Sequence, residues 1–138
     1  MNDLSYTAKV FKTVWVSDVH LGTKGSRAKE FLEFLKTIEC EKIFLVGDIV
    51  DGWQLSKRWY WPQTHNDVVQ KILEKAKRGT EIIFIPGNHD EVARDFIGLT
   101  MGGIKVKDDD IHYTADGKKF WVVHGDLFDN VIQHARWL

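Results

Sequence analysis

Short apolar runs alternate along the chain with longer segments in which apolar side chains recur every three or four positions. The short runs are rich in β-branched and aromatic residues, a composition that favours strands. They lie at residues 13–17, 42–46 and 81–85. Because these runs are apolar almost throughout, they predict strands buried on both faces, as in a parallel sheet.

Two segments between these strands have the apolar periodicity of a helix. The first is expected to begin with Ser26 as its N-cap and to run through Ile38. The second is expected to cover about residues 66–78, and Gly79 follows it as the glycine that ends a helix. Strands alternating with helices predict an α/β fold in which a buried mixed, largely parallel sheet is flanked by helices.

The last part of the chain predicts a hairpin and one more helix. Residues 111–114 and 120–123 form the two strands, and the Asp-Gly pair at 116–117 is a strong signal for a tight turn. A final helix is expected over residues 129–138. We therefore interpret residues 1–138 as the N-terminal portion of a single domain whose fold is incomplete at the C-terminus.

Composition narrows the setting in which this protein works. A chain of 138 residues with 43% hydrophobic and 28% charged residues is expected to build one domain with its own core. The net charge of -1 gives no general attraction to nucleic acid or an anionic membrane, so any affinity for phosphate must be local. Cys40 is the single cysteine, residues 1–9 lack the apolar centre of a signal peptide, and no apolar run is long enough to span a bilayer. These features predict a cytoplasmic protein, at most peripheral to the inner membrane.

Residues of the kinds that bind metals follow each predicted strand. The four clusters are Asp18-Val19-His20, Gly47-Asp48-Ile49-Val50-Asp51, Gly87-Asn88-His89-Asp90 and His124-Gly125-Asp126. Because ligand sites in open α/β sheets lie at the carboxyl ends of the strands, these clusters are expected to converge. Mixed Asp, His and Asn ligands suit manganese, iron or zinc rather than calcium.

The spacing within the clusters supports the same interpretation. Side chains two positions apart, such as Asp18 and His20, lie on one side of an extended segment and can chelate one ion. Gly47 and Gly87 each precede a candidate ligand, where the missing Cβ permits a tight turn and a close approach. Asp-x-His alone is common, and Gly-Asp after a strand is often only a turn. All four clusters in this order and at these strand ends, however, predict a metal site.

Taken together, the clusters resemble the sequence pattern of the calcineurin-like metallophosphoesterase superfamily. The longer strings at residues 17–22, 47–53 and 124–129 are similar to its UDP-2,3-diacylglucosamine hydrolase branch. The resemblance covers nearly the whole chain. It implies a metallophosphoesterase-type layered fold and hydrolysis of a phosphoester or pyrophosphate bond. It also implies two divalent metal ions as cofactors, with Mn2+ foremost and Fe2+ or Zn2+ as alternatives.

The resemblance implies a role for each candidate ligand. Asp18 and His20 are expected to bind the first metal. Asp48 is expected to bridge both metals, since a carboxylate has two oxygens that can each bind a cation. Asn88, through its amide oxygen, and His124 are expected to bind the second metal.

Further residues are candidates for catalysis and substrate binding. The resemblance implies that His89 faces the scissile phosphate as a charge stabiliser or proton donor and that Asp90 orients it. Lys24 and Arg27 are candidates for binding a second phosphate, and Trp53 for an apolar wall against a base or acyl chain. The alternatives are that Lys24 and Arg27 are ordinary solvated surface residues and that Trp53 packs in a small satellite core.

The sequence departs from the family pattern in two places. The pattern ends with Gly-His-x-His, which gives each metal one more histidine, and this chain has no such motif. His134 is either a substitute ligand or an ordinary helix residue. Some members of the branch also carry arginine where His89 stands. We expect a missing C-terminal half or another chain to complete the site, and this chain alone to bind metal weakly.

Three functions remain open at this point. The leading hypothesis is hydrolysis of a small phosphorylated substrate, with a nucleotide-sugar lipid such as UDP-2,3-diacylglucosamine as the favoured class. A nucleic-acid phosphodiesterase would be expected to carry a basic stripe along its cleft, and the scattered lysines here argue against nucleic acid as a partner. The third hypothesis is an inactive metal-binding fragment.

Overall fold

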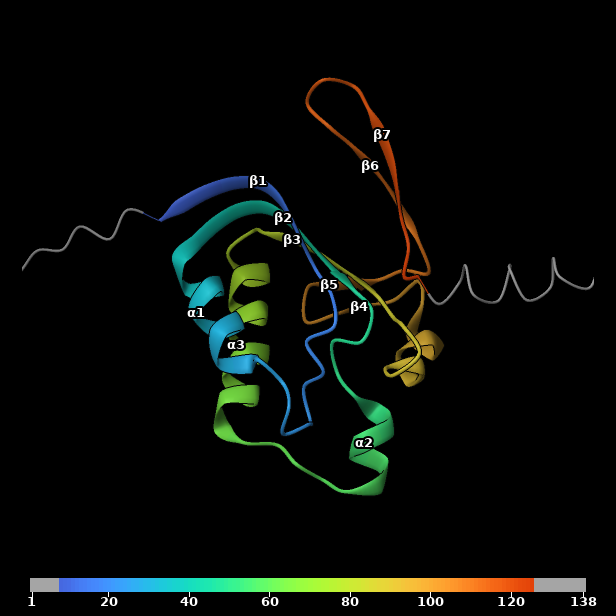
Figure 1. Ribbon diagram of the computed structural model, residues 1–138. Coiled ribbons are helices and arrows are strands. Elements are labelled where there is room, and N and C mark those ends of the chain that lie inside the picture. The colour runs from blue at the N-terminus through green and yellow to red at the C-terminus, as the bar shows by residue number, and fades with distance from the viewer. Residues whose placement is uncertain (1–7, 126–138) are drawn as a thin grey trace, which may run out of the picture.

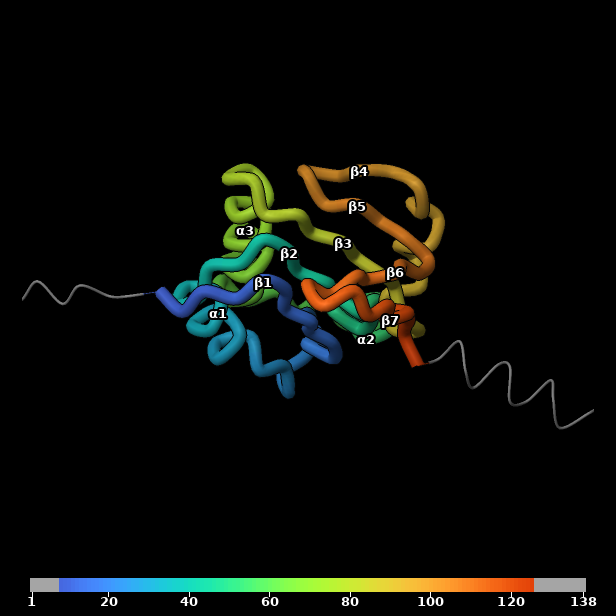
Figure 2. Tube along the Cα trace, turned by 90° about the horizontal axis from the view of Figure 1, so that it is seen from above, coloured from blue at the N-terminus to red at the C-terminus, as the bar shows by residue number. Residues whose placement is uncertain are grey.

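The computed structural model describes residues 8–125, and a five-stranded sheet lies at its centre (Figure 1). In spatial order its strands are β1 (Lys9–Val16), β2 (Ile38–Val46), β3 (Glu81–Ile85), β5 (Ile104–Val106) and β4 (Thr100–Met101) (Figure 2). The pair β4 and β5 is antiparallel, and the other three pairs are parallel. The predicted α/β class with a mixed, mainly parallel sheet is confirmed.

Two helices cover one face of this sheet. Helix α1 (Ala28–Thr37) and helix α3 (Gln63–Lys77) lie side by side and direct their apolar residues against the strands (Figure 1). The main core between these layers includes Leu35, Ile43 and Ile82, none of which is exposed. Between residues 8 and 125, no helix combines the length and the apolar character needed to cross a lipid bilayer.

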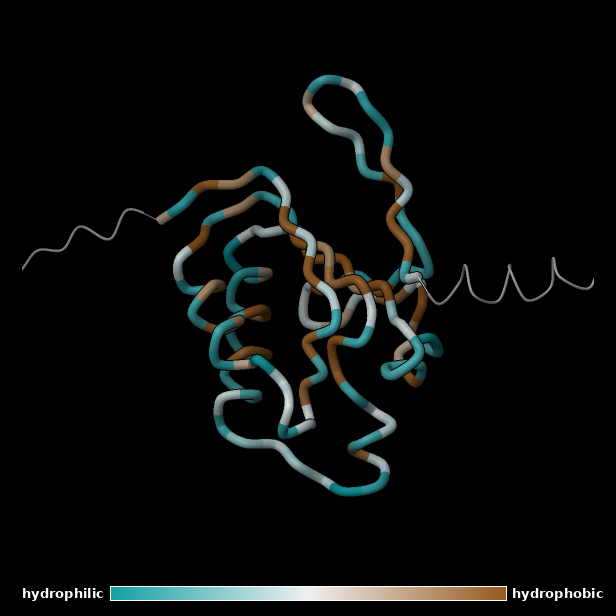
Figure 3. Tube along the Cα trace, viewed as in Figure 1, coloured by the Kyte–Doolittle hydropathy of each residue, from teal (hydrophilic) through white to brown (hydrophobic). Residues whose placement is uncertain are grey.

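A hairpin of β6 (Asp110–Tyr113) and β7 (Lys119–Val122) rises from the opposite side of the sheet (Figure 1). Its base packs on a second, smaller core in which Phe44 is fully buried. Trp15 stacks on Phe44 with ring centroids 5.9 Å apart, and His112 meets the indole edge-on at 5.0 Å. Figure 3 shows hydrophobic positions gathered along the central strands, where both cores lie. The predicted hairpin is therefore confirmed.

The first helix begins later than the sequence predicts. Helix α1 starts at Ala28, and its N-cap Arg27 makes no side-chain capping bond. The prediction that Ser26 is the N-cap is wrong, because its hydroxyl instead donates to the carbonyl of Val19 at 2.6 Å. The helix ends at Thr37, since Ile38 already has the extended backbone that begins β2.

The end of the second long helix follows the prediction. The backbone N–H of Gly79 donates to the carbonyl of Ala76 at 3.1 Å, and that of Thr80 donates to the carbonyl of Lys75 at 3.0 Å. These are the two bonds of a Schellman motif, which needs a left-handed residue after the cap. Gly79 supplies that conformation with φ of 107°.

Several short elements were missed by sequence reasoning. They are α2 (Gly52–Lys57), the 3-10 helix η1 (Glu91–Phe96), and strands β4 and β5. Strand β5 has three residues and β4 has two, too few for a periodic pattern to show. Helix α2 begins with a glycine and has no buried residue, so it lacks an apolar stripe. The predicted helix over 129–138 lies outside the described residues.

A buried lysine gives a test of this packing. Lys75 on α3 is 6% exposed, and its Nζ donates to the Ile38 carbonyl at the start of β2 at 2.8 Å. Lys75→Met keeps the aliphatic stem but leaves that carbonyl without its donor, so the free energy of unfolding should fall by roughly 1–3 kcal/mol. Urea denaturation measures the loss. The matched control, Lys77→Met on the exposed side of the same helix, should change it by about 0.5 kcal/mol or less. Equal effects of the two changes would contradict this role of Lys75.

Candidate metal centre

The loops that follow β1 and β2 are joined along their backbones. The amide of Asp18 donates to the carbonyl of Gly47 at 3.1 Å, and the amide of His20 donates to the carbonyl of Asp48 at 2.9 Å. A bridge between Leu21 and Val50 extends this pairing beyond the strands. The two clusters predicted from the sequence are therefore fixed side by side.

Three candidate ligands adopt a strained backbone. Among residues 8–125, the non-glycine residues with positive φ are Asp18 (56°), His20 (52°) and Asp48 (53°). The left-handed conformation costs an L-residue on the order of 1–2 kcal/mol. The segment from Asp18 to His20 is therefore not extended, so the reason that the sequence suggested for the two side chains lying together does not hold. Their side chains meet through two left-handed turns, with Asp18 Oδ1 and His20 Nε2 3.5 Å apart. Such strain concentrates at functional sites, where the surrounding structure imposes it.

One group of candidate ligand atoms comprises His20, Asp51 and His89. Asp51 Oδ2 lies 3.0 Å from His20 Nδ1 and 2.9 Å from His89 Nδ1. Its other oxygen accepts the amide of Gln54 and so caps helix α2. Burial acts to raise the pKa of Asp51, but the bonds from Gln54, His89 and His20 outweigh it, so this pKa lies below its usual value.

The second group comprises Asp18, Asp48 and His124, whose ligand atoms all lie within 4.8 Å of one another. His124 Nε2 is 3.4 Å from Asp48 Oδ2. Two glycines make this approach possible. A Cβ on Gly47 would overlap the His124 ring, and one on Gly87 would lie 2.7 Å from Asp48 Oδ1. The sequence prediction that these glycines permit a close approach is confirmed.

The donor atoms fit metal ions of the expected kind. Because His20 directs Nδ1 at the Asp51 carboxylate, its Nε2 remains available beside Asp18. A carboxylate behind a ligating imidazole is the usual way in which proteins orient a metal-binding histidine. Carboxylate and imidazole donors together suit manganese, iron or zinc. Asp18, Asp48 and His124 could hold an ion, and His20 offers a further donor beside Asp18.

Asp90 has a different role from the predicted one. Asp51, and not Asp90, contacts the His89 ring, so the prediction that Asp90 orients His89 is wrong. Asp90 is 5% exposed, and its carboxylate accepts the amides of Gly87 at 2.5 Å and Ile49 at 2.8 Å. It therefore ties the loop after β3 to the loop after β2.

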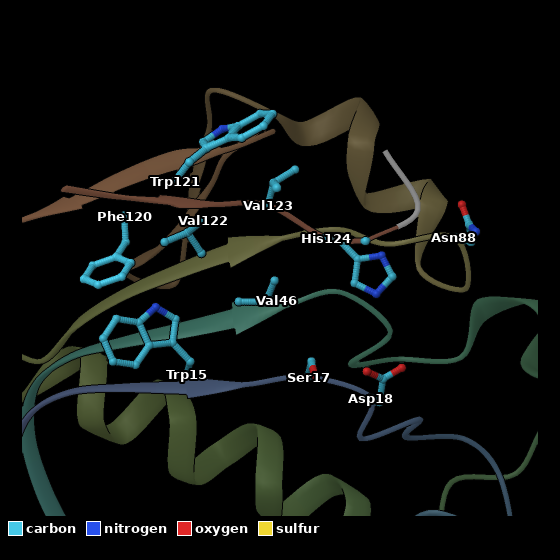
Figure 4. Close-up of a pocket in the computed structure, with 11 residues that line it drawn as sticks. Trp15, Ser17, Asp18, Val46, Asn88, Phe120, Trp121, Val122, Val123 and His124 are labelled. Atoms are coloured by element: carbon cyan, nitrogen blue, oxygen red, sulfur yellow. The ribbon is translucent and has the colours of Figure 1, made fainter. Parts of the chain in front are cut away.

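Asn88 and His124 line one cavity of about 920 Å³ (Figure 4). Asp18 lies at the same end of this cavity, and its other wall is apolar, with Trp15 and Phe120 (Figure 4). The Asn88 side chain is exposed and makes no hydrogen bond within residues 8–125. The structure thus brings Asn88 to the rim of the site, without a hydrogen bond to Asp48 or His124.

The three candidate substrate residues lie in different places. Trp53 at the start of α2 packs on His89, with ring centroids 4.3 Å apart, and is 48% exposed. Arg27 lines a hollow of about 550 Å³ that it shares with Asp18. Lys24 lines another hollow, on the side of α2.

His65 supports the site in a way that sequence reasoning missed. It is 4% exposed on α3, and its Nδ1 accepts the backbone N–H of Gly22 at 3.0 Å. This bond fixes the loop that carries Asp18 and His20. A histidine at the start of a helix gives no signal of such a contact, because its partner lies 43 residues away along the chain.

The fold and the two groups of candidate ligands place the chain in the class of metal-dependent phosphoesterases, as the family comparison shows. The family model for calcineurin-like phosphoesterases matches residues 11–137, and the chain belongs to that family. Membership implies divalent metal ions, for which the structure provides two candidate groups.

The curated relatives carry a more specific name. The chain is 26% identical over 129 residues to UDP-2,3-diacylglucosamine hydrolase of Blochmanniella pennsylvanica (strain BPEN), covering 89% of this chain and 51% of the relative. It is 27% identical over 118 residues to UDP-2,3-diacylglucosamine hydrolase of Azotobacter vinelandii (strain DJ / ATCC BAA-1303), covering 83% and 47%. The chain therefore spans about half the length of the curated relatives it matches. The crystal structure of Pseudomonas putida nuclease MPE superposes with a TM-score of 0.41 at 24% identity, covering 69% of this chain and 46% of that one.

The packing of His124 against Gly47 gives a test of the ligand group. Gly47→Ala should displace the His124 ring and lower Mn2+ affinity by ~10-fold or more, the scale on which misoriented ligands weaken metal sites. Gly79→Ala is the matched control, since it also places alanine at positive φ but has no atom within 4 Å of the new Cβ. It should lose about 1–2 kcal/mol of stability without a change in affinity. Isothermal titration with Mn2+ separates the two, and unchanged affinity in Gly47→Ala would contradict the role of His124.

The bond between His65 and Gly22 predicts a pH dependence of stability. Burial lowers the pKa of His65, so the unfolded chain takes up this proton first as the pH falls below about 6.5. The free energy of unfolding should therefore decrease from about pH 6.5 down through the folded pKa. In His65→Asn the amide oxygen replaces Nδ1 as acceptor and does not titrate. The free energy of unfolding, measured with urea at pH 7.5 and 5.5, should change less in the variant than in the original chain. Equal changes in the two would contradict the role of His65 in the pH dependence.

Proposed function

We propose that this chain forms the metal-binding half of a dinuclear phosphoesterase that hydrolyses a phosphoester or pyrophosphate bond in a nucleotide-sugar lipid of the UDP-2,3-diacylglucosamine kind. The observation that carries the proposal is the cluster of Asp18, Asp48 and His124, which follow β1, β2 and β7 and whose ligand atoms all lie within 4.8 Å of one another. His20 Nε2 lies 3.5 Å from Asp18 Oδ1, beside this cluster. Family membership and the names of the two curated relatives support it. A protein acting on such a lipid would work in the cytoplasm, peripheral to the inner membrane.

We assign the ligands as the sequence predicts. Asp18 and His20 would hold the first ion, Asp48 would bridge both, and Asn88 and His124 would hold the second. Mn2+ is the proposed metal, with Fe2+ or Zn2+ as alternatives. The family's Gly-His-x-His motif is absent from this sequence, so the remaining ligands would come from a missing C-terminal half or from another chain.

The chain's own residues divide the chemistry among them. Two divalent ions, when bound, acidify a water and neutralise charge on the phosphoryl oxygens. His89 is held by Asp51 through Nδ1, which leaves Nε2 as the atom that passes a proton to the leaving oxygen. Trp53 packs on the same ring and limits its rotation. Asp90 acts through the backbone of both loops, as a positioning residue.

The proposed roles of Asp48 and His89 separate in one experiment. Asp48→Asn should abolish Mn2+ binding, because the carboxylate that would bridge the two ions is lost. His89→Ala should keep Mn2+ and lower turnover of bis-p-nitrophenyl phosphate by roughly 10²–10⁴-fold, the usual contribution of a general acid. Metal content and turnover are measured on the same samples, with the exposed Asp95→Asn as control. Loss of metal in His89→Ala would mean that His89 is a ligand.

The substrate class is tested by competition. UDP-2,3-diacylglucosamine should inhibit turnover of the chromogenic diester more strongly than a single-stranded oligonucleotide at equal phosphate concentration. Stronger inhibition by the oligonucleotide would favour the nucleic-acid alternative, and no turnover in any sample would favour an inactive metal-binding chain.

A further inference from the structure

The hollow lined by Lys24 is separate from the cavity of Figure 4 and lies between the loop after β1 and helix α2. It has a volume of about 280 Å³. Its lining consists of Gly22, Thr23, Lys24, Gln54, Arg58 and Tyr60. No carboxylate is among these residues, whereas the two groups of candidate metal ligands contain Asp18, Asp48 and Asp51.

Four of the side chains that line this hollow carry hydrogen-bond donors without protein acceptors, whereas the Thr23 hydroxyl donates to the His20 carbonyl at 2.9 Å. Within residues 8–125, the side chains of Lys24, Gln54, Arg58 and Tyr60 make no hydrogen bond or ion pair. On the neighbouring helix, by contrast, Arg78 pairs with a glutamate at 2.9 Å. A lysine and an arginine that share a concave surface without a carboxylate produce a local positive potential, which the overall charge of -1 does not provide.

The backbone around the hollow is fixed. Gly22 is held by the bond from its N–H to His65, and a Cβ on it would lie 2.6 Å from the Leu55 side chain. Helix α2 is capped by Asp51 at one end, and the Arg58 N–H donates to the Gln54 carbonyl at the other. The donors of Lys24, Gln54 and Arg58 therefore project from a defined framework.

The hollow is connected to the metal centre through two short segments. Gly22 follows His20 by two residues. The backbone N–H of Gln54 donates to Asp51, the residue that also contacts His20 and His89. The two segments that form the hollow therefore also carry residues of the candidate metal centre.

We infer that this hollow is a second anion subsite, in which Lys24 and Arg58 bind the non-reacting phosphate of a substrate that carries two. Arginine pairs with phosphate through two parallel N–H bonds, and lysine adds a point charge. The inference deepens the proposed function and rests on it for the direction in which the substrate lies. It predicts that pyrophosphate-containing substrates are preferred over those with one phosphate.

The subsite is tested first by binding. Inorganic pyrophosphate is titrated into 15N-labelled protein, and the amide shifts of Gly22 and Gln54 are followed together with those of Gly87 at the metal side. The original chain should show saturating shifts at Gly22 and Gln54. Arg58→Ala and Lys24→Ala should each weaken that binding about tenfold, the expected scale for one charged hydrogen bond. Lys57→Ala is the matched control, because this neighbouring cation does not line the hollow, and it should leave the binding unchanged.

Two results would overturn the inference. One is the absence of shifts at Gly22 and Gln54 in the original chain, and the other is an equal loss in Lys57→Ala, which would indicate general attraction of anions. A parallel assay keeps this separate from the proposed function. Arg58→Ala should raise KM for a UDP-linked pyrophosphate substrate while leaving turnover of bis-p-nitrophenyl phosphate unchanged. Failure of all hydrolysis with intact pyrophosphate binding would reject the proposed function alone, whereas hydrolysis without subsite binding would reject this inference alone.

Discussion

The site depends most on the hydrogen bonds that the buried carboxylate of Asp90 accepts from two loops. Its two oxygens accept backbone amides from both loops: Gly87 at 2.5 Å, Ile49 at 2.8 Å, Asp48 at 3.2 Å and Val50 at 3.5 Å. A charge buried in this way is stable only when its hydrogen bonds are satisfied, and here the loop amides satisfy them. In return, the bonds hold Asp48 in its left-handed conformation. Asp48, a candidate metal ligand, is thus positioned by a residue that belongs to neither group of candidate ligands.

Asp51 contacts two histidines to which the sequence analysis gives different roles, a metal ligand and a proton donor. One of its oxygens contacts the imidazoles of His20 and His89, whose rings are nearly perpendicular with centroids 4.9 Å apart. One carboxylate therefore orients both the proposed metal ligand His20 and the proposed proton donor His89. Because the other oxygen caps α2, the position of Trp53 and the wall of the anion subsite depend on the same residue.

The sequence predicts the convergence of the clusters because parallel strands end at one edge of a sheet, and this requires no detail of the loops. It does not predict which aspartate contacts which histidine. Asp90 follows His89 directly, yet Asp51 reaches the ring through a loop whose path depends on hydrogen bonds between distant residues. Short elements were missed for a related reason: β5 has three residues, and its pairing with β3 is decided by tertiary contacts. Arg58 likewise lies at the end of a six-residue helix without an apolar stripe, so nothing in the local pattern marked its position.

The distribution of charge also constrains the order in which ligands bind. Asp18, Asp48 and Asp51 gather at the strand ends. Two charges of the same sign about 4 Å apart repel each other by roughly 4 kcal/mol near a protein surface. A phosphate would meet net repulsion from these carboxylates unless divalent cations were already bound. The anion subsite lies apart from this cluster and carries its own cations. Positive charge from the protein is thus available for the non-reacting group, while the reacting group depends on the metals. This separation allows one small chain of nearly neutral charge to offer sites for both cations and phosphates.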